Sequence, residues 1–86
     1  MDKINVVINS PQKKLFEQKA LSVSVPAEDG YLTVLPGHAP MLAGLKEGVI
    51  EVSASSQKQT FNISSGFIEV NEAGVTLLIK EAEKTS

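Results

Sequence analysis

The 86-residue chain contains no cysteine and no tryptophan, and it has a single histidine. The lack of cysteine excludes disulfides, thiolate metal sites and thiol nucleophiles, so nothing ties the chain to an oxidising compartment and we expect it in the cytoplasm. A lone histidine has no second imidazole and no thiolate beside which to bind a metal. The sequence therefore indicates neither a metal site nor a cofactor.

Long apolar runs and an excess of one charge are also missing. No stretch approaches the roughly 20 apolar residues of a membrane-spanning helix, so we expect no direct insertion into a membrane. The N-terminus has no basic region followed by an apolar one, and we expect no signal peptide. Eight basic and ten acidic residues are mixed along the chain, for a net charge of -2, whereas a nucleic-acid binder would show a basic stripe. We therefore expect no nucleic-acid partner.

What the chain does have is alternation of apolar and polar residues, which is typical of strands with one buried face. Breaker residues separate the runs, and only Glu81–Lys84 has helical propensity. About nine strands are predicted, at 4–9, 14–18, 20–25, 31–35, 41–45, 49–54, 58–63, 67–70 and 75–80. Nine to ten short strands predict an all-β fold, a two-sheet antiparallel β-sandwich or flattened barrel, formed by a single domain over residues 1–86.

The phase of the alternation predicts which side chains face the interior. The set expected to point inward is Ile4, Val6, Ile8, Leu21, Val23, Val25, Ile50, Val52, Phe61, Ile63, Ile68, Val70, Val75, Leu77 and Ile79. Polar turns are expected between these runs at 55–58 and 71–74, the second with a glycine that can take a positive φ.

The segment 30–42 carries the clearest local signal. An apolar run ends at Pro36-Gly37, and His38 and Pro40 follow. The two prolines remove two backbone donors and favour extended geometry in the residues before them, and Gly37 can take the positive φ of a type II turn. Because this rigid loop holds no nucleophile, metal cluster or phosphate cradle, it indicates protein contact.

Patterns for catalysis are weak. Asn62–Gly66 superficially resembles a nucleophile turn, but it lacks the first glycine, a following helix and a His–Asp partner pair, so a small hydrolase is not favoured. Paired carboxylates for acid–base catalysis remain an alternative, although solvated faces and turns are the commoner reason for acidic residues. A free-standing small-ligand-binding sandwich is a second alternative, and it would need a cleft of convergent polar and aromatic groups.

Three segments resemble the ATP synthase epsilon subunit. Leu35–Pro40 lies in a stretch that resembles the family loop Gly-x-Leu-Gly-Ile-Leu-Pro-Gly-His-x-Pro-Leu-Leu. Ser65–Val70 is similar to the family strand Gly-Gly-Phe-Leu-Glu-Val, and Val75–Leu78 to the strand Val-Thr-Val-Leu that follows it. The opening Val6-Val7-Ile8-x-x-Pro11 also fits. Since order and spacing agree, the resemblance covers essentially the whole chain.

The resemblance implies a non-catalytic central-stalk subunit of a bacterial F-type proton-translocating ATP synthase. Such a subunit links the gamma shaft to the membrane c-ring for rotary coupling, with the alpha and beta subunits as indirect partners. It lies as a peripheral protein on the cytoplasmic face of the inner membrane. The gamma side is assigned to Pro36, Gly37, His38, Ala39 and Pro40, and the ring-facing loop to Glu28, Asp29, Gly30 and Tyr31.

The sequence departs from the family pattern at three positions and at its end. Tyr31 stands where the family often has an acidic residue, Thr33 replaces a frequent glycine, and Ser65 replaces the first glycine of the Gly-Gly pair. The family continues into a C-terminal helical hairpin with inhibitory and ATP-sensing roles, whereas this sequence ends at Ser86. We therefore expect the hairpin to be absent, and with it ATP binding and epsilon-type inhibition of ATP hydrolysis.

Overall fold

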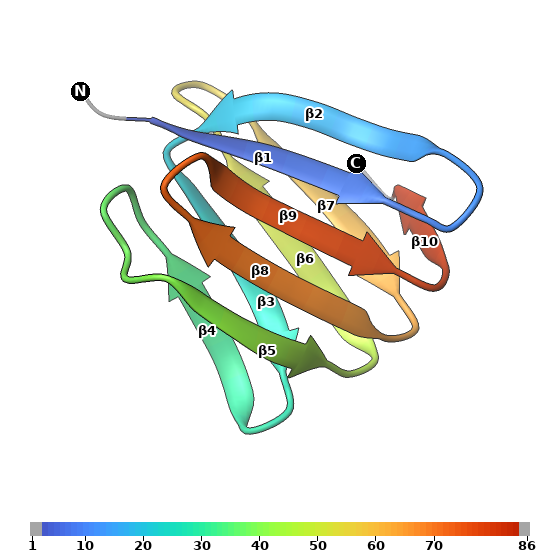
Figure 1. Ribbon diagram of the computed structural model, residues 1–86. Helices are drawn as coiled ribbons and strands as arrows, with labels where there is room; N and C mark the ends of the chain where they lie inside the picture. Colours follow the sequence, from blue (N-terminus) through green and yellow to red (C-terminus); the bar gives the residue numbers. More distant parts are fainter. Residues whose placement is uncertain (1–2, 85–86) are drawn as a thin grey trace.

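The computed structural model describes residues 3–84, and this part of the chain folds into ten strands without a helix (Figure 1). The predicted all-β fold is therefore confirmed, while the ends of the predicted domain range 1–86 lie outside the described residues. The strands are β1 (Ile4–Asn9), β2 (Lys14–Ala20), β3 (Ser22–Ala27), β4 (Gly30–Val34), β5 (Met41–Leu45), β6 (Gly48–Ser53), β7 (Lys58–Ile63), β8 (Gly66–Asn71), β9 (Gly74–Ile79) and β10 (Ala82–Lys84).

The strands form two layers that meet at β3. Strand pairing runs β10-β7-β6-β3-β5-β8-β9-β1-β2, and β4 pairs with β3. The first residues of β3 pair with β6, whereas its last residue, Ala27, pairs with Leu45 of β5. In Figure 1 the layer β5-β8-β9-β1-β2 accordingly lies in front of β3, β6 and β7. This arrangement is the predicted sandwich.

One pairing in the sandwich is parallel. β1 runs alongside β9 with Val6 opposite Val75 and Ile8 opposite Leu77, while the other pairings are antiparallel. No hairpin joins β1 to β9, so the direction of this pair is not imposed by a turn. The parallel pair joins the N-terminal hairpin β1–β2 to the β8–β9 hairpin and completes the front layer.

The core lies between the two layers and consists of aliphatic side chains with one phenylalanine. Of the predicted inward set, all are buried except Ile4 and Leu21, which are only half-buried. Ile4 still packs against the core. Phe61 is 3% exposed and meets Phe16 edge-on, with ring centroids 5.3 Å apart at 73°. The core also takes in Ala20, which the alternation did not predict.

The sequence-based assignment was wrong at two places. The predicted strand 20–25 crosses a layer boundary, because Ala20 ends β2 in the front layer and Leu21 precedes β3 in the back layer. The segment with helical propensity, Glu81–Lys84, contains strand β10 instead, whose three residues pair with β7. A four-residue helix would be marginal in water, whereas the open edge of β7 offers unpaired backbone groups for hydrogen bonding.

Candidate functional site

The loop between β4 and β5 has the turn geometry that its sequence predicts. The His38 N–H donates to the Leu35 carbonyl at 3.0 Å, which closes a four-residue turn. Gly37 has a φ of 85°, close to the value that the third residue of a type II turn requires. Pro36 supplies the second residue with its fixed φ. This loop is therefore held by its own covalent geometry and one hydrogen bond.

The His38 ring also bonds within the loop. Its Nδ1 lies 2.7 Å from the Ala39 carbonyl oxygen, and its Nε2 has no partner among the described residues. Ala39 precedes Pro40, which favours extended backbone at Ala39 and so fixes the direction of that carbonyl. The ring is thus oriented by the loop itself.

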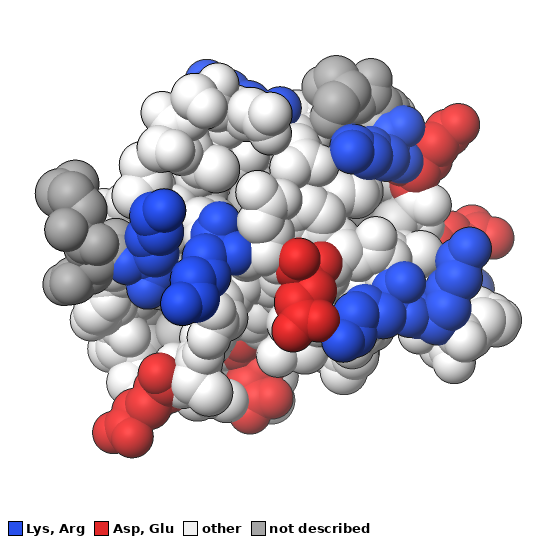
Figure 2. All heavy atoms as spheres, turned by 90° about the horizontal axis from the view of Figure 1, so that it is seen from above, with Lys and Arg blue, Asp and Glu red and all other residues white. Residues whose placement is uncertain are grey.

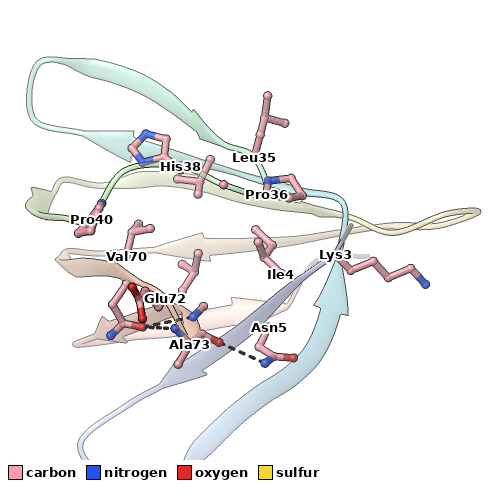
Figure 3. Close-up of a pocket in the computed structure, with 15 residues that line it drawn as sticks. Lys3, Ile4, Asn5, Leu35, Pro36, His38, Pro40, Val70, Glu72 and Ala73 are labelled. Carbon is pink, nitrogen blue, oxygen red and sulfur yellow. Dashed lines mark hydrogen bonds between the residues drawn. The ribbon is translucent and has the colours of Figure 1, made fainter. Parts of the chain in front are cut away.

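A cavity of about 490 Å³ lies between this loop and the β8–β9 turn (Figure 3). Its lining comes from three parts of the chain: the β4–β5 loop, the start of β1 and the β8–β9 turn. Val34, Val70 and Val75 are buried residues of the core that also line the cavity. Lys3 and Glu72 are its charged residues. The predicted gamma-side residues Pro36, Gly37, His38 and Pro40 therefore lie beside one cavity that sequence reasoning did not foresee.

The opposite wall of the cavity is fixed by side-chain to backbone hydrogen bonds. Asn71 Oδ1 accepts from the N–H groups of Ala73 at 2.8 Å and Gly74 at 3.2 Å. Asn5 Nδ2 donates to the Ala73 carbonyl at 3.2 Å, as Figure 3 shows. These bonds tie the β8–β9 turn to itself and to β1, so both walls of the cavity are ordered without a partner.

The predicted ring-facing residues form the β3–β4 turn, at the other end of β4. Glu28 and Asp29 are the two turn residues, and Gly30 follows with a φ of 132°. The Glu28 N–H donates to the Gly44 carbonyl at 3.3 Å, which joins the turn to β5. The acidic side chains of Glu28 and Asp29 are exposed. The turn therefore presents two carboxylates at one corner of the sandwich.

Tyr31 is the second residue of β4, and its side chain reaches to β6 in the back layer. Its hydroxyl oxygen accepts a hydrogen bond from the Val49 N–H at 3.1 Å, at the start of β6. Its register partner Pro26 is buried, and a Cβ placed on Gly48 would lie only 2.7 Å from the Pro26 Cβ and 3.0 Å from the tyrosine hydroxyl. The residue as a whole is 62% exposed. Tyr31 therefore anchors the β3–β4 hairpin to β6 while one side of its ring stays accessible.

The structure does not bring the two predicted contact segments together. β4 separates them, and at roughly 3.3 Å per residue its five residues span about 16 Å. In Figure 1 the β4–β5 loop lies at the left and the β3–β4 turn at the bottom. The two segments therefore face different directions on one hairpin of the sandwich.

Three large apolar side chains are exposed on the outward face of the front layer, where Glu69 lies opposite Leu42, and the sequence reasoning missed this group. Leu42, Phe67 and Leu78 are 74%, 58% and 55% exposed, and they come from the neighbouring strands β5, β8 and β9. Phe67 and Leu78 are register partners, and we call these three residues the outer apolar face. The doublet Leu77-Leu78 was the available signal, because adjacent strand residues point to opposite sides. Large exposed apolar side chains that gather on one face mark an interaction surface.

A second cavity of about 580 Å³ borders the outer apolar face. Phe67 and Leu78 line it together with Glu28, Asn9 and Lys80. Most of its other lining is backbone or aliphatic. The Asn9 Oδ1 atom is buried without a hydrogen-bond partner. The outer apolar face thus leads from Leu42, two residues after Pro40, toward the corner where Glu28 lies.

Charged residues are interspersed on the face seen in Figure 2, and no area of one sign extends across it. The exposed edge strand β2 carries an ion pair, with Lys14 Nζ 2.6 Å from Glu17 Oε1. Charges of this kind discourage edge-to-edge pairing of sheets. Among residues 3–84, no helix is long and apolar enough to cross a membrane, and no three acidic or histidine side chains gather where they could hold a metal ion.

Comparison with known proteins gives a consistent result. The family "ATP synthase, Delta/Epsilon chain, beta-sandwich domain" matches residues 3–85. The ATP synthase epsilon chain of Leptospira borgpetersenii is 37% identical over 76 residues, which cover 88% of this chain and 60% of that protein. The epsilon chain of Rhizobium rhizogenes is 37% identical over 82 residues, covering 94% and 61%. This chain therefore spans about 60% of the length of the curated relatives it matches.

Solved structures share the fold. A chain in the cryo-EM structure of the Euglena gracilis mitochondrial ATP synthase, described as OSCP/F1/c-ring, superposes with a TM-score of 0.88 at 26% identity, over 95% of this chain and 53% of that one. A chain in the central stalk/c-ring structure of the Tetrahymena thermophila mitochondrial ATP synthase superposes with a TM-score of 0.81, over 95% of this chain and 66% of that one. At 13% identity, the second match concerns the fold alone.

Proposed function

This chain belongs to the family of ATP synthase delta/epsilon chain β-sandwich domains, and we propose that it acts as a non-catalytic central-stalk subunit of a bacterial F-type proton-translocating ATP synthase. In that role it links the gamma shaft to the membrane c-ring, so that rotation of the ring reaches the catalytic head. Its curated relatives are ATP synthase epsilon chains, and these support the assignment. They do not favour the alternative of a free-standing small-ligand-binding module.

The observation that supports the mechanical role is that the two segments predicted to make contacts lie at opposite ends of β4. A link between two partners needs two surfaces and a stiff body between them. The β3–β4 hairpin lies on a close-packed core, and such interiors have low compressibility and transmit strain. Tyr31 adds a bond from β4 to Val49, and Glu28 bonds the turn to Gly44. These two bonds hold the turn end of the hairpin against the sandwich.

We assign the shaft side to the Pro36–Pro40 loop and the outer apolar face. The loop supplies Pro36, Gly37, His38, Ala39 and Pro40, and its prolines reduce the entropy lost when a partner orders it. Leu42 lies two residues after Pro40 and connects the loop to the outer apolar face. Prolines, glycines and aliphatic side chains suit contact and not bond-making, which supports a non-catalytic role.

We assign the ring side to the β3–β4 turn, with Glu28, Asp29, Gly30 and Tyr31. The two exposed carboxylates suit a partner loop that carries basic side chains or amide donors. Assembly with the ring would hold this chain as a peripheral protein at the cytoplasmic face of the bacterial inner membrane. The alpha and beta subunits would then be indirect partners, reached through gamma.

The experiment that tests this function is affinity capture of the tagged chain from detergent-solubilised native membranes. We expect gamma, the ring subunit, alpha and beta to be recovered together. A matched pair of variants locates the shaft side: Phe67→Ser removes an exposed ring from the outer apolar face, and Asn62→Ser alters an exposed residue of β7 in the other layer. Phe67→Ser should lower the yield of gamma and Asn62→Ser should not. A chain that emerges as a lone soluble monomer would contradict the proposal.

A further inference from the structure

His38 is the one histidine of this chain, and its ring contacts its own loop in a way that fixes where the proton lies. The Nδ1 atom lies 2.7 Å from the Ala39 carbonyl oxygen. A carbonyl oxygen can only accept a hydrogen bond, so the Nδ1 atom must carry the proton. In a neutral imidazole the other nitrogen, Nε2, then has a free lone pair and is an acceptor.

The backbone around the ring keeps this arrangement in place. The His38 N–H donates to the Leu35 carbonyl, which holds the backbone of His38 in the turn. Pro40 restricts Ala39 to extended geometry, which holds the carbonyl that Nδ1 contacts. The backbone and the Ala39 carbonyl are therefore in place before any other protein binds, and the Nδ1 contact orients the ring.

The loop is also poor in hydrogen-bond donors. Pro36 and Pro40 have no N–H group, and the His38 N–H is already used. Within 36–40 only Gly37 and Ala39 keep an unused backbone N–H, whereas the His38 Nε2 has no partner among the described residues. A partner that contacts this loop therefore pairs with it best by supplying hydrogen-bond donors.

We propose that His38 is held as the Nδ1–H tautomer and presents Nε2 as an acceptor to a hydrogen-bond donor of the bound partner. The donor is a hydroxyl, an amide NH2 or a cationic N–H group. This inference rests on the proposed function for the identity of the partner, the gamma subunit, but the tautomer is a property of this chain alone.

The tautomer is tested on the isolated chain by 15N NMR. Because the chain has one histidine, a sample labelled at the imidazole nitrogens gives a single pair of signals. We expect a protonated, pyrrole-type signal from Nδ1 and an unprotonated, pyridine-type signal from Nε2 at a pH where the ring is neutral. The reverse assignment, with the proton on Nε2, would overturn the inference whatever the chain binds.

The acceptor role is tested by titration with the isolated gamma subunit of the same organism. His38→Asn keeps an N–H near the position of Nδ1 but has no atom at Nε2, whereas His38→Ala removes both. Loss of the acceptor leaves a donor of gamma unpaired, so both variants should bind gamma about tenfold more weakly than the unaltered chain. On binding, the Nε2 signal of the unaltered chain should shift as it accepts the bond. Unchanged affinity in His38→Asn would overturn the acceptor role.

If the unaltered chain does not bind gamma at all, the proposed function fails and the partner half of the inference fails with it, while the 15N spectra still decide the tautomer.

Discussion

Two hairpin glycines offer a test of how closely β1 approaches the β8–β9 turn. Gly30 and Gly74 each follow a two-residue turn, and their φ values are 132° and 140°. An alanine at either position should lower the free energy of unfolding by a similar amount through backbone strain, about 1–3 kcal/mol for a residue at such a positive φ. The surroundings differ. A Cβ on Gly30 has nothing within 4 Å, whereas a Cβ on Gly74 would overlap the Asn5 carbonyl oxygen and lie 2.9 Å from the Asn5 Cβ.

The difference between the two variants should therefore report the overlap alone. In Gly74→Ala the backbone of β1 must move, and the parallel β1–β9 pairing and the bond from Asn5 to Ala73 depend on its position. We expect a loss above about 4 kcal/mol, the range in which a specific structural fault is diagnosed. A chain of 86 residues has a stability of only about 4–13 kcal/mol. Gly74→Ala should therefore be close to unfolding, and Gly30→Ala should remain folded.

Urea unfolding followed by circular dichroism measures both losses. Gly30→Ala should lower the midpoint by an amount that corresponds to about 1–3 kcal/mol, with an unchanged slope. Gly74→Ala should show either a much lower midpoint or no folded baseline. Equal losses in the two variants would refute the reasoning, because they would mean that β1 does not constrain the β8–β9 turn.

Three further substitutions test the core, the outer apolar face and the hairpin anchor. Phe61→Ala should lower stability by about 3–5 kcal/mol in thermal unfolding, since Phe61 is buried against Phe16, and an unchanged melting curve would remove it from the core. Phe67→Ala should leave stability within about 0.5 kcal/mol but weaken binding to gamma in a titration, and unaltered affinity would exclude the outer apolar face from the interface. Tyr31→Phe removes the acceptor of the Val49 N–H and should cost about 1 kcal/mol in urea unfolding, with faster hydrogen exchange at Val49, and protection equal to that of the unaltered chain would contradict the anchor role.

The sandwich could be predicted from this sequence because its strands and turns are indicated by residues close together in the chain. Alternation with a period of two names the buried residues of each strand, and turn residues mark the ends. The same reasoning placed the type II turn at Pro36-Gly37 correctly, since φ at both positions depends on residue type. It failed at Leu21, because the chain passes there from one layer to the other. The alternation on one side of this position therefore does not predict which side chains are buried on the other side.

What the sequence could not predict depends on pairs of residues far apart in the chain. Strand β10 forms because the edge of β7 is open, not because its residues favour strands. The bond from Tyr31 to Val49, the cavity between the β4–β5 loop and the β8–β9 turn, and the contact of Asn5 with Ala73 follow from the three-dimensional arrangement alone. The outer apolar face lies between these cases, since Phe67 was visible in the sequence but its neighbours across strands were not.

Site-directed cross-linking in the assembled enzyme tests the central claim most directly, and because this chain has no native cysteine an introduced one is its single thiol. A single cysteine is introduced as Ala39→Cys in the β4–β5 loop or as Asp29→Cys in the β3–β4 turn, both exposed positions. Each variant is the control for the other. A short thiol-to-amine cross-linker in native membranes should join Ala39→Cys to gamma and Asp29→Cys to the ring subunit. Exchanged products, or no product with either partner, would contradict a chain that links the shaft to the ring through opposite ends of β4.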